Sequence, residues 1–312
     1  MQRGSRIFVA GGRSMIGSAI LRRLQAEGLS PIAADEEPDY RDRSAVDAFL
    51  ARQRPQYVFV AAGETAGIGG NTGRPADLMT DNLLAAANLI PAAAGHGAEK
   101  LLYLASSCIY PKHAPHPLQP ASLWTGPVEP TSAAYATAKL AGVVMVDAFR
   151  RQHAKPFVAA IGADAYGPGD DFSAENAHVV GALIRRFDEA ARAAAPFVEV
   201  WGSGTPRREF IYVDDLAAAC VFAMQRYDGT GAINLGTGVD NSIAELATEV
   251  ARVVGFVGAI RFDRSRPDGM PFKGLDSTVL HGLGWRPQWT LTRGLEETYR
   301  WYKEVRLKPD PR

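Results

Sequence analysis

A tyrosine and a lysine that could move a proton lie four residues apart in the segment SAAYATAKLAG (132–142). At this spacing Tyr135 and Lys139 share one face of a helix. A nearby ammonium favours the phenolate and lowers a tyrosine pKa, so the sequence predicts proton exchange between Tyr135 and a carbonyl or alcohol oxygen during hydride transfer. Ser106 ends the apolar run KLLYLASS (100–107), where its hydroxyl could bind the same oxygen.

Cysteine occurs at only two positions, Cys108 and Cys220, and Cys108 follows Ser106 by two residues. If Ser106 ends a strand, Cys108 lies beside the same ligand. A lone cysteine is more often a small buried apolar residue than a catalytic group, and that interpretation of Cys108 stays open at this point. Two cysteines do not indicate a disulfide framework.

A glycine-rich turn follows the first β-type run, RIFVA (6–10), and precedes a helical pattern that ends at Gly28. Glycines at both ends of such a turn let the backbone approach a pyrophosphate at the helix N-terminus. The pattern predicts a dinucleotide-binding site, with a plain strand–helix turn as the alternative. The turn AGGRSMIGS (10–18) supplies the expected cofactor contacts, which are Gly11, Arg13, Ser14, Met15, Ile16 and Gly17.

Asp35 ends the second β-type run, SPIAAD (30–35), where the residue that contacts the adenosine ribose is usually found. A carboxylate accepts hydrogen bonds from a 2′-hydroxyl and repels a 2′-phosphate, so Asp35 favours NAD over NADP. Arg13 could still meet a phosphate, which keeps NADP open as the cofactor. Ala61 and Ala62, at the end of the third β-type run, are expected beside the same cofactor.

Short β-type runs alternate with helical patterns through the first half of the chain. This alternation predicts a doubly wound parallel sheet, the Rossmann type of α/β fold, with helices on both faces. Active groups gather at the carboxyl edge of such a sheet, where Ser106 would lie. The predicted strands are 6–10, 30–35, 57–62, 100–107 and 156–163, and the predicted helices are 44–54, 75–95 and 131–153.

After about residue 166 the elements become shorter, which predicts a smaller C-terminal lobe packed on the sheet. In that lobe, 243–255 has the pattern of an amphipathic helix closed by Gly255, whereas the end of the chain is expected to be irregular. The expected division is a dinucleotide-binding domain at 1–165 with a returning segment at about 212–238, and a substrate lobe at 166–211 and 239–312.

Composition argues against several functional classes. Thirty-four basic residues balance 34 acidic ones, which gives no support for a nucleic-acid or membrane-surface protein. No segment has the uncharged length needed to span a bilayer, and the N-terminus lacks the apolar region and cleavage site of a signal peptide. We therefore expect a cytoplasmic protein with no nucleic-acid or membrane partner and no metal site.

Six segments spread over nearly the whole chain carry more specific motifs. They are SSCIYP (106–111), EPTSAAYATAKLAG (129–142), NAHVVGALIRRFDEA (176–190), VWGSGTPRREFIYVDDLA (200–217), NLGTGVDNSIAELA (234–247) and RPDGMPFKGLD (266–276). Together they resemble the extended short-chain dehydrogenases/reductases that act on nucleotide sugars, and among these the GDP-L-fucose synthase family. The resemblance implies NAD or NADP as cofactor, a nucleotide-diphosphate sugar as substrate, and a homodimer built on the alanine-rich helices at about 75–95 and 131–153.

The resemblance also implies catalytic roles for Cys108 and His178. A ketone at sugar C4 acidifies the hydrogens on C3 and C5, and inverting either carbon requires one group that removes a proton and another that delivers one. Cysteine and histidine suit this task by their pKa values. His178 would otherwise be an ordinary surface histidine at a helix start. The implied function is a GDP-sugar 4-keto epimerase/reductase that transfers hydride at C4.

Further positions are implied to bind the substrate, mostly its nucleotide on the C-terminal lobe. Arginine and lysine are suitable partners for a diphosphate. A solvated helix face is the alternative for Arg185, and a core aromatic role is the alternative for Trp201. The implied substrate-binding residues are Ser107, Arg185, Trp201, Arg208 and Lys273.

Four positions depart from the family pattern. The family usually has an arginine near Asp35, a lysine at Glu64, an asparagine at Asp164 and an arginine at Phe272. Each change removes positive charge or adds negative charge beside phosphate-bearing ligands, which indicates an altered cofactor or substrate. A redox-neutral NAD-dependent nucleotide-sugar 4-epimerase and a non-catalytic nucleotide-binding relative are therefore alternatives.

Overall fold

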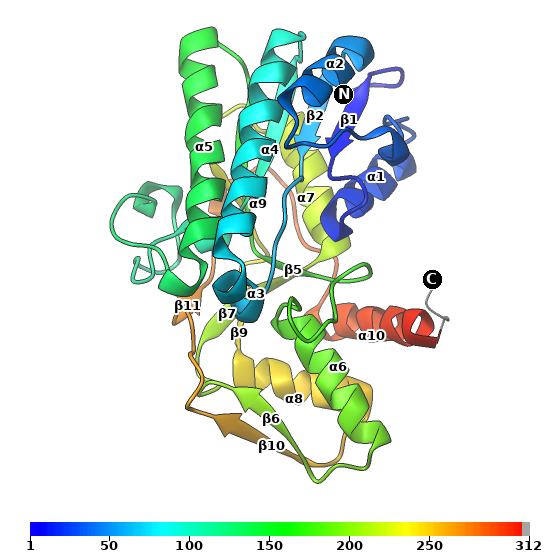
Figure 1. Ribbon diagram of the computed structural model, residues 1–312, viewed down its shortest axis with the longest axis vertical. Helices are drawn as coiled ribbons and strands as arrows, with labels where there is room; N and C mark the ends of the chain where they lie inside the picture. Colours follow the sequence, from blue (N-terminus) through cyan, green and yellow to red (C-terminus); the bar gives the residue numbers. More distant parts are fainter. Residues whose placement is uncertain (308–312) are drawn as a thin grey trace.

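A five-stranded parallel sheet forms the centre of the larger lobe in the computed structural model, which describes residues 1–307 (Figure 1). Its strands are β1 (Ile7–Ala10), β2 (Tyr57–Val60), β3 (Lys100–Ser106), β4 (Val158–Gly162) and β8 (Ile233–Leu235), in that spatial order. Each neighbouring pair is parallel. The predicted Rossmann-type α/β sheet is confirmed.

Helices cover both faces of this sheet, so its strands are buried along their whole length and are almost continuously apolar. On one side α1 packs against α7, and on the other α4 packs against both α2 and α5 (Figure 1). The helices are α1 (Met15–Ala26), α2 (Arg43–Gln53), α4 (Pro75–Gly95), α5 (Ala133–His153) and α7 (Val213–Arg226). Short elements beside them are η1 (Ala34–Glu36), α3 (Ile68–Gly73), η2 (Ser107–Ile109), η3 (Pro120–Ser122), η4 (Pro130–Ser132) and α9 (Thr278–Gly282).

The prediction of a strand at 30–35 is wrong. This segment makes one bond to the sheet, from the Ile32 N–H to the Ile7 carbonyl at 2.8 Å, and continues into the 3₁₀ turn η1. Pro31 has no N–H to donate to a ladder, and three consecutive acidic residues follow at 35–37, which a buried strand could not accommodate. β1 is consequently an edge strand of the described sheet, with the acidic segment beside its carboxyl end.

The smaller lobe has a core of its own, formed by buried residues that include Phe187, Val200, Leu246 and Leu295. The helix α8 begins with a capping box between Ser242 and Glu245, and its cap Gly255 has a left-handed backbone, as its pattern predicts. The lobe contains the strands β5 (Asp164–Tyr166), β6 (Phe197–Trp201), β7 (Arg207–Tyr212), β9 (Asp240–Ser242), β10 (Ala259–Asp263) and β11 (Phe272–Lys273), and the helices α6 (Val179–Arg192), α8 (Ile243–Val254) and α10 (Leu291–Leu307).

The prediction of an irregular chain end is also wrong, because Leu291–Leu307 is the helix α10 (Figure 1). Leu295, Thr298 and Tyr302 are buried and recur at intervals of three and four residues. This helical spacing is present in the sequence, but it is interrupted by many charged residues. α10 packs against α8 and β7 and thereby closes the small lobe.

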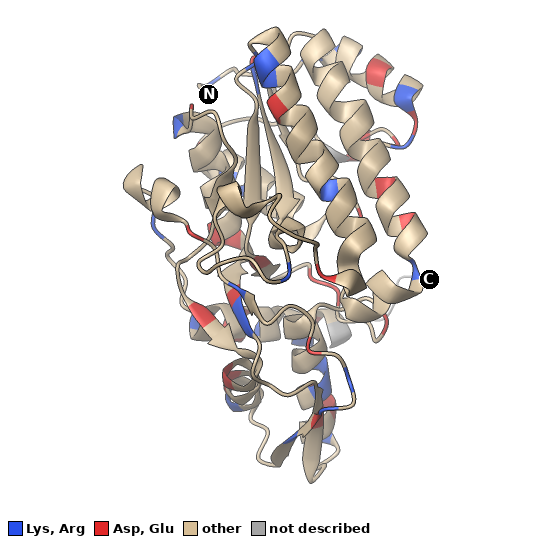
Figure 2. Ribbon diagram, turned by 90° about the vertical axis from the view of Figure 1, so that its left-hand side faces the viewer, with Lys and Arg blue, Asp and Glu red and all other residues tan. Residues whose placement is uncertain are grey.

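Charged residues of both signs are interspersed over the lobes, while most of the central sheet is uncharged (Figure 2). This distribution matches the balanced composition of the chain. Within residues 1–307, no helix combines the length and apolar character that crossing a membrane requires.

Candidate active site

The candidate catalytic residues meet at the carboxyl edge of the central sheet. Ser106 is the last residue of β3, and Cys108 follows it in the short turn η2. Tyr135 and Lys139 lie on the first turns of α5, which packs against both β3 and η2. Because parallel strands end at the same edge, these side chains are brought together from separate parts of the chain.

Lys139 is buried, and its ammonium points at backbone carbonyls of this edge. It donates to the carbonyls of Ala62 at 3.2 Å and Leu104 at 3.4 Å. Burial lowers the Lys139 pKa to about 8. The side chain therefore contacts the ends of β2 and β3, beside the residues expected to hold a cofactor.

The Tyr135 pKa lies above its usual value, not below it as the spacing from Lys139 predicts. Tyr135 is buried, and burial raises the pKa of its phenol, with the nearby Cys108 acting in the same direction. The hydroxyls of Thr65 and Ser106 hydrogen-bond to the phenol and oppose this shift, but burial is the larger effect. Tyr135 is consequently held as a neutral phenol, the form that can donate a proton.

Cys108 contacts a buried ion pair. The Lys273 ammonium lies 2.7 Å from an Asp164 carboxylate oxygen and 3.5 Å from the Cys108 sulfur. Burial alone would raise the Asp164 pKa, but Lys273 and Arg208 hold it below its usual value. Ser107 donates to the same carboxylate at 3.3 Å. The structure therefore places Lys273, which the resemblance assigned to the nucleotide end, against the candidate acid/base cysteine.

His178 reaches the site from the small lobe, at the position just before α6. Its Nε2 lies 3.1 Å from the Thr65 hydroxyl oxygen. Burial lowers the His178 pKa, although the nearby Asp164 carboxylate opposes this change. Both candidate groups for carbon acid/base chemistry, Cys108 and His178, thus lie near the Tyr135 phenol. Cys108 is close enough to raise the phenol pKa, and His178 contacts Thr65.

The glycine turn fits a dinucleotide. Gly11 has φ of +84°, and a Cβ there would lie 2.8 Å from the Ala61 carbonyl oxygen. A Cβ on Gly17 would lie 1.9 Å from the Gly11 carbonyl oxygen, so only glycine permits this close approach. Ser14 caps α1 by accepting from the Gly17 N–H. The N–H groups of Met15 and Ile16, at the N-terminus of this helix, have no partner among residues 1–307.

An acidic residue other than Asp35 contacts the glycine turn. The Glu37 carboxylate accepts from the Gly12 N–H at 2.7 Å and the Gly11 N–H at 3.1 Å, and the Tyr40 hydroxyl joins this cluster. Asp35 is exposed, and its backbone carbonyl accepts from Arg13 at 3.2 Å. Glu37 therefore holds the glycine turn through hydrogen bonds to its backbone. Asp35 and Arg13 lie together at the surface, where the adenosine ribose of a dinucleotide is expected.

The residues implied to bind the nucleotide form a second group on the small lobe. Trp201 is half-exposed, and the guanidinium groups of Arg186 and Arg266 lie over its ring, at 5.6 and 4.8 Å from the ring centre. Arg185 pairs with Glu189 at 3.2 Å, and its buried Nε has no partner within residues 1–307. Arg208 lies nearer the catalytic edge, since Asp164 and Cys108 both act on its pKa.

Sequence reasoning missed three residues of this site. Thr65 is near two acid/base candidates, Glu37 contacts the glycine turn, and Asp170 is a buried carboxyl group that follows Gly169, a residue next to Met15 of α1. Glu37 stands twenty positions after Gly17, which is the usual distance of the acidic residue in such folds. That spacing could have identified Glu37, whereas no local pattern identifies Thr65.

Asp170 gives the stability of the protein a specific pH dependence. One of its carboxyl oxygens is buried without a partner among residues 1–307, and burial raises its pKa to about 7. The native state therefore retains a proton between about pH 4 and 7 that the unfolded chain has lost. We expect the free energy of unfolding to fall with rising pH there, with a contribution from Asp170 of at most about 1.4 kcal/mol per pH unit.

Asp170→Asn should remove this contribution and raise the free energy of unfolding at pH 7 to 8, because the amide fills the same volume without a charge. Denaturant unfolding at several pH values measures both effects. Asp263→Asn is the matched control, since the Asp263 carboxylate accepts from the Ser265 N–H at 3.0 Å and is not among the groups that act on the Asp170 pKa. An unchanged pH slope in the Asp170 variant would contradict the assignment.

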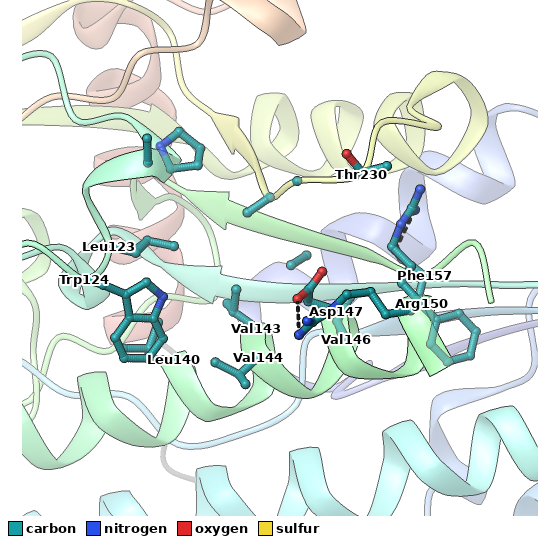
Figure 3. A pocket seen from close by; sticks show the side chains of 16 residues that line it. Leu123, Trp124, Leu140, Val143, Val144, Val146, Asp147, Arg150, Phe157 and Thr230 are labelled. Carbon is teal, nitrogen blue, oxygen red and sulfur yellow. Dashed lines mark hydrogen bonds and ion pairs between the residues drawn. The ribbon is translucent and has the colours of Figure 1, made fainter. Parts of the chain in front are cut away.

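A hollow of about 430 Å³ lies away from this site, between α5, the 120–124 segment and the 230–232 turn (Figure 3). Leu123, Trp124 and Leu140 form part of its apolar wall, and Trp124 is 71% exposed. Its described lining does not include the acid/base candidates, so we assign no chemistry to it.

Comparison with known proteins gives concordant matches. Residues 7–236 match the NAD dependent epimerase/dehydratase family. The chain is 47% identical to a putative GDP-L-fucose synthase 2 of Arabidopsis thaliana, over 97% of this chain and 93% of that protein. It is 44% identical to the GDP-L-fucose synthase of Escherichia coli, over 96% and 97% of the two chains.

A solved structure resembles the whole fold. The GDP-mannoheptose C4 reductase of Campylobacter jejuni, with NADP bound, superposes with a TM-score of 0.86 at 31% identity, covering 97% of this chain and 99% of that one.

Proposed function

The chain belongs to the NAD-dependent epimerase/dehydratase family, and from that premise we propose that it is a GDP-sugar 4-keto epimerase/reductase of the GDP-L-fucose synthase type. One observation supports this activity above the others. Tyr135, Cys108 and His178 come from different elements and face one site. A ketoreductase needs only the first of these groups, so the other two call for a second kind of chemistry.

The nicotinamide cofactor, when bound, supplies the hydride that reduces the ketone at C4. Arg13 and the free N–H groups of Met15 and Ile16 would hold its pyrophosphate. Tyr135 gives its phenolic proton to the C4 oxygen, which Ser106 also hydrogen-bonds. Lys139, fixed between two carbonyls, places its ammonium at the end of β2 and β3 and stabilises developing negative charge there.

Cys108 and His178 exchange protons with the carbons next to the ketone. Each inverted carbon loses a proton to one group and gains one from the other, so the pair must flank the sugar ring. Lys273 lies 3.5 Å from the Cys108 sulfur and stabilises it when it is negatively charged. Asp164 holds Lys273 in this position through the 2.7 Å ion pair.

The nucleotide would lie along the group formed by Arg208, Arg185, Arg186, Arg266 and Trp201. The half-exposed indole offers a face for a base, and the flanking guanidinium groups suit a diphosphate. The buried Arg185 Nε, without a partner in residues 1–307, is a further donor for such a ligand.

Turnover in deuterated water tests the proposed function. We expect GDP-4-keto-6-deoxymannose to oxidise NADH or NADPH and the product to carry deuterium at C3 and C5. A dTDP-4-keto-6-deoxy sugar is the control for the nucleotide base. Reduction without deuterium would exclude the epimerase role, whereas bound NAD that is never consumed would indicate a redox-neutral epimerase.

Asp35 should determine the preference between the two cofactors. It is exposed beside Arg13, and its carboxylate would repel a 2′-phosphate. We expect the protein to use NADH in preference to NADPH, and Asp35→Arg to shift the ratio of kcat/KM toward NADPH by about 10-fold or more, which corresponds to about 1.4 kcal/mol.

Glu36→Arg is the matched control for this shift in cofactor preference. It changes the charge equally, but the Glu36 carboxylate accepts from Gln53 at 2.7 Å and so points toward α2. If both variants shift the preference alike, the effect is one of net charge and the assignment to Asp35 fails.

We further propose a homodimer formed through the outward faces of α4 and α5. These helices pack against one another, and Val144 of α5 is 42% exposed beside the apolar hollow (Figure 3). Val144→Glu should convert a dimer to a monomer in analytical ultracentrifugation, because it buries a charge in the interface. Val279→Glu, at a 56% exposed valine of α9, should leave the dimer intact. A monomeric parent protein would contradict this proposal.

A cytoplasmic location is part of the same proposal. Cys108 and Cys220 are both free thiols, as expected in a reducing compartment. Cell fractionation with an antibody against the chain would test it.

A further inference from the structure

Thr65 lies between Tyr135, the proposed proton donor in ketone reduction, and His178, a proposed acid/base group in epimerisation. It belongs to the segment that joins β2 to α3, and its side chain is exposed toward the site. Its hydroxyl lies 3.1 Å from His178 Nε2, and it acts on the pKa of the Tyr135 phenol as a hydrogen-bonding neighbour. A hydroxyl can donate one hydrogen bond while accepting another, so it can pass a proton between these two partners.

The backbone holds this contact in place. The Gly67 N–H donates to the Asn176 carbonyl at 2.8 Å, and a Cβ on Gly67 would lie 2.3 Å from the Ala177 carbonyl oxygen. Only glycine allows the Thr65 segment to approach the residues before His178 this closely. The Asn71 amide also donates to the carbonyls on either side of this turn, at residues 66 and 67. The contact between the lobes is therefore built into the fold.

We propose that Thr65 is a proton relay that returns to Tyr135, from His178, the proton spent on each ketone. This inference rests on the proposed function for the identity of the reaction. It assigns His178 two tasks, one at the sugar carbons and one in resetting the reductase, so that both reactions draw protons from a single histidine.

The proposed relay conserves the number of protons. Tyr135 loses its hydroxyl proton to the C4 oxygen and becomes a phenolate. Thr65 gives its hydroxyl proton to the phenolate oxygen and takes one from Nε2 of protonated His178. Tyr135 and Thr65 are then restored, and the neutral, half-buried His178 regains a proton from water. No electrons move in these steps, because the electron pair of the reduction is the hydride itself.

Other charged groups also act on the two ends of the relay. Asp164, Lys273 and Asp171 act on His178. Cys108 and Asp164 act on Tyr135, and Tyr135 in turn acts on Tyr103. A change at Thr65 leaves all of these groups in place, so it tests the hydroxyl separately from the surrounding charge.

The test measures multiple-turnover reduction across pH, because the relay restores Tyr135 only after each ketone has been reduced. Thr65→Val, which keeps the shape and removes the hydroxyl, should slow reduction by about 10-fold and abolish the part of the pH profile that follows His178. Thr65→Ser should restore both. Thr72→Val is the matched control, since the Thr72 hydroxyl donates to carbonyls within α3 at 2.9 and 3.0 Å. Thr65→Val with an unchanged rate and profile would overturn the relay.

A double variant distinguishes a proton-relay role of Thr65 from a purely positioning role. Adding His178→Asn to Thr65→Val should slow reduction no further than His178→Asn alone, because both changes interrupt one path. Fully additive losses would show that the two side chains act independently, and would also overturn the relay.

A titration without cofactor or substrate keeps this inference distinct from the proposed function. Nitrogen NMR of His178 should show a changed Nε2 signal and a shifted titration midpoint in Thr65→Val but not in Thr72→Val. Identical His178 spectra in all three proteins would mean that the contact is absent in solution. If instead the spectra change but no GDP-4-keto sugar is reduced by the parent protein, the proposed function fails and the contact stands.

Discussion

Tyr135→Phe should lower the rate of ketone reduction by between about 10² and 10⁴, the usual contribution of a positioned proton donor. The substitution removes the single hydroxyl to which Thr65 and Ser106 hydrogen-bond, while the ring still fills its buried site. Cofactor affinity should change little, because Lys139 and the glycine turn are untouched. Stopped-flow measurement of cofactor oxidation, together with equilibrium binding of the cofactor, checks both expectations.

Tyr103→Phe is the matched control for this loss. Tyr103 lies on β3, and its buried hydroxyl has no hydrogen-bond partner within residues 1–307. Removing such a group is close to neutral or slightly stabilising, because its desolvation is not offset by a bond. Equal losses of activity in the two variants would mean that the Tyr135 hydroxyl has no specific role.

Most of the fold could be predicted from the sequence because its strands and helices have regular apolar patterns. The strands β1 to β4 are continuous apolar runs, and α8 has a capping box and a closing glycine. The segment at 30–35 misled the prediction, since Ile32 and its alanine neighbours look β-like while Pro31 and the acidic residues after them prevent pairing. The pattern of α10 was obscured because charged residues separate its three buried positions.

The site was less predictable than the fold, because its important contacts join residues that are distant in sequence. The helical spacing of Tyr135 and Lys139 can be seen in the sequence, but the shifts in their pKa values cannot. Burial governs both side chains, and it raises the pKa of one and lowers that of the other. The contact of Thr65 with His178 spans two lobes, so no local motif indicates it.

The departures from the family pattern have different structural consequences. Asp164 gains a buried partner, since its carboxylate pairs with Lys273 at 2.7 Å and so takes up a positive charge that a phosphate could otherwise use. Phe272 packs on His116, with 4.0 Å between the ring centres. Asp35 and Glu64 are exposed, and Glu64 acts on the pKa of Arg41. Of the four positions, only Asp164 contacts the candidate acid/base group directly, through Lys273.

Cys108→Ala should strongly lower deuterium incorporation at one or both carbons next to the ketone while leaving its reduction largely intact. At least one of C3 and C5 should lose exchange by about 10² or more, because a proton donor or acceptor is removed from one face of the ring. Reduction should persist, since Ser106, Tyr135 and Lys139 remain and Lys273 keeps its ion pair with Asp164. Mass spectrometry and NMR of the product formed in deuterated water measure both reactions in one sample.

Cys220→Ala is the matched control, because Cys220 is fully buried in α7, where burial raises its pKa to about 12. It should cost on the order of 1 kcal/mol in the free energy of unfolding and leave both reactions unchanged. A product of Cys108→Ala with full deuterium at both carbons would show that His178 and water suffice. A simultaneous loss of reduction would show instead that the cysteine serves the ketone rather than the carbons beside it.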